Sequence, residues 1–112
     1  MNMTNFQFNE SGVCINPLTL YEIKTPNISL CLKGAETPTG WDVAINLAGS
    51  NSGCSRGVWE HECTRTKADA ISEACRVVLD KLDAMERDGE RVNQEMKNTV
   101  RGWMQGQQLT MF

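Results

Sequence analysis

The stretch Trp-Asp-Val-Ala-Ile-Asn-Leu at residues 41–47 decides the fold class. Its large apolar side chains occupy every second position, which is the period of a β-strand buried on one face. Residues 28–33 repeat this alternation, and the segment 34–40 between the two stretches contains a proline, two threonines and two glycines. Such a segment is typical of a loop, so we predict two neighbouring antiparallel strands.

Further strands are predicted on both sides of this pair. On the N-terminal side, residues 18–24 could form a further strand, and the preceding Pro17 indicates either an edge strand or a bend. On the C-terminal side, the glycine-rich connection Ala48–Gly57 leads to a strand over Val58–Thr64. Short polar connections favour an antiparallel meander, so we expect a sheet of four or five strands within residues 5–64.

The second half of the chain is predicted to be helical. Apolar residues recur every three or four positions within 66–88, which places them on one stripe of a helix, and Thr66 opens a sequence that resembles a capping box. A second helix is expected over 90–104. The predicted fold class is α+β: an antiparallel sheet of four or five strands packed by one long amphipathic helix, plus a second C-terminal helix. These elements form a single domain over 1–104, followed by a C-terminal tail over 105–112.

Length and charge narrow the function classes. The 112 residues suffice for one small domain, and 11 basic against 14 acidic residues give a net charge of −3, which argues against direct nucleic-acid binding. The polar start of the chain is not typical of a secretory signal, and no stretch has the roughly 18 consecutive apolar residues of a membrane helix. We therefore expect a cytoplasmic protein with no membrane partner.

No set of residues has the pattern of a catalytic or metal centre. Cys54, His61 and Cys63 are of zinc-ligand type, but the paired short spacing and a fourth ligand are absent. His61 is the only histidine of the chain, and no local signature pairs it with a nucleophilic cysteine and a carboxylate. The segment Gly49–Gly57 lacks the lysine and the spacing of a phosphate-binding loop, so we interpret it as a hairpin loop. We expect a non-enzymatic protein without a metal or a cofactor.

The sequence ends with Gln108-Leu109-Thr110-Met111-Phe112, which resembles the bacterial sliding-clamp-binding motif. The usual pattern of that motif is Gln-Leu-Ser/Asp-Leu-Phe, found at or near the ends of replicative and repair polymerases and of other clamp clients. Thr110 stands for serine here, and Met111 replaces leucine at nearly constant volume. The resemblance implies that Gln108 binds a polar pocket of the clamp and that Leu109, Met111 and Phe112 fill an apolar one. The alternative is that these apolar side chains fold back into the core of the protein.

A second resemblance covers residues 40–82. Gly-Trp-Asp-Val at 40–43 and Thr-Lys-Ala-Asp-Ala-Ile at 66–71 are similar to HicB-type antitoxin domains, in which a strand meander precedes a helix that opens with Thr-x-x-Glu-Ala. The strand before the helix is longer here than in that family. The resemblance implies a fold only, one that many small phage and plasmid proteins share.

Together these observations predict a phage or mobile-element binding protein whose C-terminal residues dock on a bacterial sliding clamp or related replication machinery. The alternative is an anti-CRISPR-like inhibitor of a host defence complex that acts through the folded domain. Glu60 and Glu62, on one face of the expected strand 58–64, would then meet a basic groove. In both cases the partner is a bacterial protein, and the sequence leaves homodimer formation open.

Overall fold

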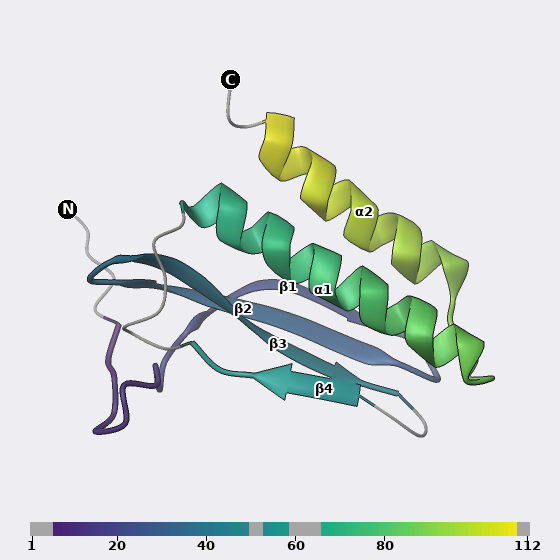
Figure 1. Cartoon of the computed structure of the whole chain (residues 1–112), viewed down its shortest axis with the longest axis horizontal. Helices are drawn as coiled ribbons and strands as arrows, with labels where there is room; N and C mark the ends of the chain where they lie inside the picture. The colour runs from purple at the N-terminus through teal and green to yellow at the C-terminus, as the bar shows by residue number, and fades with distance from the viewer. Residues whose placement is uncertain (1–5, 50–52, 59–65, 110–112) are drawn as a thin grey trace.

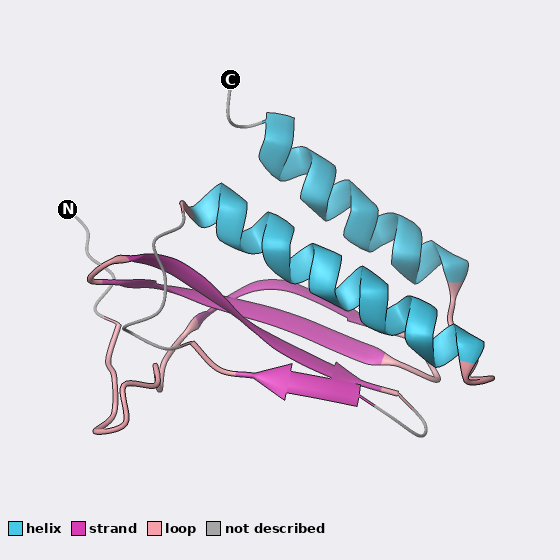
Figure 2. Ribbon diagram, in the orientation of Figure 1, coloured by secondary structure: helices cyan, strands magenta, loops and turns pink. Residues whose placement is uncertain are grey.

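The computed structural model describes residues 6–49, 53–58 and 66–109. Four strands form one antiparallel sheet, and two helices lie beside each other on one face of it (Figure 1; Figure 2). This arrangement confirms the predicted α+β fold class, with one long helix and a C-terminal helix. The elements in chain order are β1 (Leu18–Lys24), β2 (Ser29–Thr37), β3 (Gly40–Ala48), β4 (Gly53–Arg56), α1 (Lys67–Arg87) and α2 (Gln94–Leu109).

The sheet is a meander in which each strand pairs with its neighbour in the sequence, in the order β1-β2-β3-β4. The loop predicted over 34–40 is wrong for most of its length, because β2 and β3 stay paired up to Thr37 and Gly40 and only Pro38-Thr39 form the turn. The Thr37 hydroxyl oxygen accepts a hydrogen bond of 3.1 Å from the Gly40 backbone N–H. The Thr37 side chain thus stabilises a tight turn at a place where the composition predicts a longer loop.

β1 is an edge strand, one of the two outcomes that the preceding proline indicates, and it carries a bulge. The register shifts between Thr19 and Tyr21, so Leu20 is an additional residue in the strand. Leu20 lies over Gly34 of β2, where a Cβ atom would come within 2.8 Å of the Leu20 Cδ1. The glycine therefore makes room for the bulge, and a bulge at a sheet edge hinders pairing with another chain.

β4 contradicts our interpretation of Gly49–Gly57 as a loop, since Gly53–Arg56 pairs with β3. The Arg56 guanidinium fixes the strand by donating hydrogen bonds to both carboxylate oxygens of Glu73 on α1, at 3.2 and 2.5 Å. Its Nε also donates to the Val43 carbonyl oxygen, at 3.1 Å. Of the strand predicted over Val58–Thr64, Val58 is not in a strand, and the remainder lies outside the described residues.

The helix boundaries follow from capping side chains. α1 begins after Thr66, whose hydroxyl oxygen accepts a hydrogen bond of 3.1 Å from the Asp69 N–H, and it ends before Gly89 at φ +88°. The predicted span of 66–88 is therefore confirmed. α2 differs from its predicted span of 90–104. It begins after Asn93, whose side-chain oxygen accepts a hydrogen bond of 2.8 Å from the Glu95 N–H, and it continues to Leu109. Part of the expected tail over 105–112 is thus helical.

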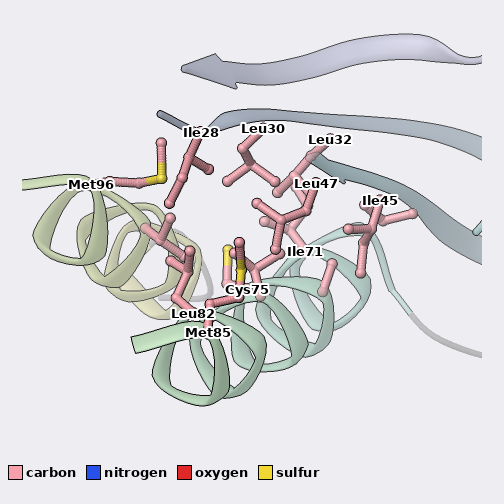
Figure 3. Close-up of a cluster of buried hydrophobic side chains, with 14 of the residues drawn as sticks. Ile28, Leu30, Leu32, Ile45, Leu47, Ile71, Cys75, Leu82, Met85 and Met96 are labelled. Carbon is pink, nitrogen blue, oxygen red and sulfur yellow. The ribbon is translucent and has the colours of Figure 1, made fainter. Parts of the chain in front are cut away.

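The main core lies between the sheet and the two helices (Figure 3). Alternate side chains of β2 and β3 point toward the apolar stripe of α1, and Met96 and Val100 of α2 complete the cluster. Every large side chain at the centre of this layer is fully buried, including Leu32, Ile45 and Leu82. The stripe that the sequence predicts for α1 therefore covers the sheet as expected.

A smaller cluster lies on the opposite face of the sheet, at one end. Cys14 and Val58 are buried there against Ala35, and Phe6 and Phe8 pack around them. The N-terminal segment contributes only an isolated bridge between Phe8 and Cys14 rather than a strand of the sheet. This segment therefore covers one end of the second face and leaves the middle of that face without a helix.

Candidate partner-binding surfaces

The middle of the helix-free sheet face is the first candidate surface, and we call it the open face. Its side chains come from the alternate positions of the strands that do not point into the main core. Two shallow hollows of about 580 and 640 Å³ lie across it and share Glu22, Cys31 and Asn46. The other side chains that line these hollows from this face are mainly polar: Thr19, Lys24, Ser29, Lys33, Ala44 and Ser55.

The open face carries hydrogen-bonding groups of several kinds. Lysine, glutamate, asparagine and hydroxyl groups offer both donors and acceptors of hydrogen bonds across the strands. Cys31 is a free thiol in the middle of the face. In the described ranges, no group of three or more His, Cys, Asp or Glu side chains is arranged to hold a metal ion.

The C-terminal part of α2 is the second candidate surface, and its distance from the core changes along the helix. Met96 and Val100 are completely buried, while Trp103 and Met104 are only half-buried at the edge of the core. The Trp103 ring stacks on Tyr21 of β1, with ring centroids 4.5 Å apart and an interplanar angle of 15°. Among the side chains described, Met104 is the last one of α2 that packs against the core.

An ion-pair cluster around the buried Lys97 attaches the beginning of α2 to α1. The Lys97 ammonium lies 2.7 Å from Asp83 and 2.8 Å from Glu86, and its side chain is 5% exposed, whereas those carboxylates are 50% and 45% exposed. The hydrogen bond from Lys97 lowers the pKa of Asp83, and the bonds to Asp83 and Glu86 raise the pKa of Lys97. Lys97 and Asp83 therefore each favour the charged form of the other.

The Arg56–Glu73 ion pair likewise joins two elements, because it connects β4 to α1. The hydrogen bond with Glu73 raises the pKa of Arg56 above its already high ordinary value, although partial burial opposes this effect. A bidentate pair of this kind fixes the orientation of both side chains. Together with Lys97 it holds the helix layer in place, so these charges are structural and leave the open face free for contacts.

The predicted partner-binding side chains all lie outside the part of the chain that the structure describes, so their arrangement stays a prediction. Gln108 and Leu109 lie in the last turn of the α2 backbone, and their side chains lie outside the described part. Met111, Phe112, Glu60 and Glu62 also lie outside the described residues, as do His61 and Cys63. Cys54 is half-buried on β4 against the main core.

Sequence reasoning missed three residues that position α2. The predicted helix over 90–104 includes Lys97 and Trp103, and the predicted strand over 18–24 includes Tyr21, but neither prediction identifies the side chains that they contact. The spacing of Lys97 gives one available signal, because it follows the buried Met96 directly and so lies next to the apolar stripe. The side chains that these residues contact lie on other secondary-structure elements, so the pattern of one element does not show these contacts.

Comparisons with protein-family models, with curated proteins and with solved structures give no match for this chain. No helix in the described ranges is long and apolar enough to span a membrane.

Proposed function

We propose that this chain is a non-enzymatic binding protein that docks on a bacterial sliding clamp through Gln108-Leu109-Thr110-Met111-Phe112. The observation that carries the proposal is the course of α2. Its last described core contact is Met104, and the helix then continues to Leu109 with Gln105 exposed. The motif therefore begins four residues after the last core contact among the described side chains.

The chemistry of the motif suits such a contact. A glutamine offers both a donor and an acceptor for a polar pocket, and Leu109, Met111 and Phe112 supply apolar side chains for a neighbouring one. Most of the binding energy would come from burying these apolar groups, whereas the glutamine would fix the register. The folded domain would then be the part that is brought to replicating DNA, or the part that blocks other clients.

Titration against purified clamp tests this proposal. We expect the full chain to bind with a Kd of about 1 μM, or roughly −8 kcal/mol. A chain that ends at Gln107 and the variant Gln108→Ala should bind at least tenfold more weakly. Gln7→Ala is the matched control, because it removes an exposed glutamine that lies outside both the motif and α2. Equal affinity of the full chain and the truncated chain, or no binding by the full chain, would refute the proposal.

A second candidate function, inhibition of a host defence complex through the folded domain, is supported by the hollows on the open face. Its polar lining, with two lysines around Glu22, suits contact with a protein surface rather than with an apolar ligand. Asn46→Arg would place a long charged side chain where the two hollows meet. Binding to a purified defence nuclease that survives truncation at Gln107 but is lost in Asn46→Arg would favour this function over clamp docking.

A further inference from the structure

The clamp-like motif and helix α2 overlap in the sequence. α2 ends at Leu109, so the first two motif residues are part of its last turn. In a helix, Gln108 lies only about 6 Å along the axis from Met104, at 1.5 Å per residue. Because Met104 packs on the edge of the core, a partner that binds Gln108 in this helix would lie against the folded domain.

The end of α2 is built differently from the end of α1. α1 has Arg87 in its last turn, and the Asp88 N–H closes it with bonds of 3.1 Å to the Ala84 and Met85 carbonyl oxygens. The last turn of α2 has no basic residue and contains Gly106. Glycine is the least favourable residue in a helix interior apart from proline, and a C-terminus without cationic side chains lacks a favourable interaction with the helix dipole.

We propose that residues 105–109 unwind when the motif binds, whereas α2 up to Met104 stays folded. This inference rests on the proposed clamp function and names how the motif is released. Extension of the segment from about 1.5 to about 3.3 Å per residue roughly doubles its reach, which carries Gln108 away from the domain surface. The Tyr21–Trp103 stack sets the boundary, because it anchors the helix just before the segment that unwinds.

Two glycines in α2 provide a matched test. A Cβ atom added to Gly102 or to Gly106 would meet nothing within 4 Å, so alanine fits at either position without a clash. Both substitutions strengthen the helix, but only Gly106 lies in the segment that unwinds. We expect Gly106→Ala to weaken clamp binding by about fivefold, the factor that corresponds to roughly 1 kcal/mol of helix propensity. We expect Gly102→Ala to leave the affinity unchanged.

The outcomes separate this inference from the proposed function. If the wild-type chain does not bind the clamp, the proposed function fails. If the wild-type chain binds and the two alanine variants bind equally well, or are weakened equally, the unwinding of residues 105–109 is refuted. A peptide of residues 105–112 controls for direct contact of the new methyl group, because Gly106→Ala should not change its affinity. Hydrogen exchange gives an independent readout: protection of the amides of 106–109 should fall on binding, and that of 97–104 should persist.

Discussion

The stack between Tyr21 and Trp103 is the contact whose removal we can predict in most detail. The rings lie 4.5 Å apart at 15°, and Trp103 is half-buried. A fully buried tryptophan costs about 3–5 kcal/mol when replaced by alanine, so half burial gives roughly 2 kcal/mol for Trp103→Ala. The ring pair itself should contribute about 1 kcal/mol of this through direct coupling.

A double-mutant cycle measures that coupling. Urea unfolding of the wild type, Trp103→Ala, Tyr21→Ala and the double variant is followed by far-ultraviolet circular dichroism, since a fluorescence signal would change with the tryptophan itself. The double variant should lose about 1 kcal/mol less stability than the sum of the single variants. Trp103→Phe keeps a ring in place and should retain part of the coupling. Strictly additive single effects would show that the stack does not hold α2 on the sheet.

Three further predictions concern charge, thiol chemistry and strand packing. The bond from Lys97 holds the pKa of Asp83 below its ordinary value, so this pair stabilises the fold at neutral pH. The stabilisation is lost as the pH falls through the lowered pKa. Asp83→Asn should therefore flatten the acid side of the stability–pH profile measured by thermal melts. Burial raises the pKa of the Cys75 thiol to about 11, so iodoacetamide at pH 8 should alkylate it only after denaturant is added, and rapid labelling of the native chain, read by peptide mass spectrometry, would contradict its burial. A Cβ atom at Gly53 would collide with the Leu47 backbone carbonyl oxygen of β3, whereas a Cβ atom at Gly34 would meet the flexible end of the Leu20 side chain. Gly53→Ala should therefore lower Tm clearly more than Gly34→Ala does in parallel melts.

The parts of the fold that were predictable from sequence are those with a local cause. The alternation at 41–47 predicts β3, and the apolar stripe with its Thr66 cap predicts α1 almost to the residue. Both patterns are strong because one face of each element is fully buried. The start of α2 also has a local cause in Asn93, which our prediction overlooked.

The parts that were wrong depend on pairing with a neighbouring strand, which the composition of the segment itself does not show. Gly53–Arg56 has the composition of a loop. It forms a strand because it pairs with the edge of β3 and because Arg56 forms an ion pair with Glu73. In the same way, the loop predicted over 34–40 underestimated how far β2 and β3 stay paired. Tertiary pairing therefore overrides weak strand preference in both places.

The two candidate binding surfaces differ in the same way, because only one of them has a local cause in the sequence. The clamp-like motif is visible in the sequence, because it is a short run of side chains that needs no tertiary context. The open face is not visible, because it combines alternate positions from all four strands. Only the register of the meander brings these positions to one surface.

The meander also determines the order in which the molecule is expected to assemble. Strands that are neighbours both in sequence and in the sheet are joined by short loops, whose closure costs little conformational entropy. The sheet should therefore form within about milliseconds. The stack of Tyr21 on Trp103, by contrast, joins the first strand to the last helix. Of the elements described, α2 is the last to leave the ribosome during synthesis. A nascent chain therefore carries a nearly complete sheet and α1 while it still exposes the strip of core that α2 covers, and that interval is when the protein is most open to aggregation.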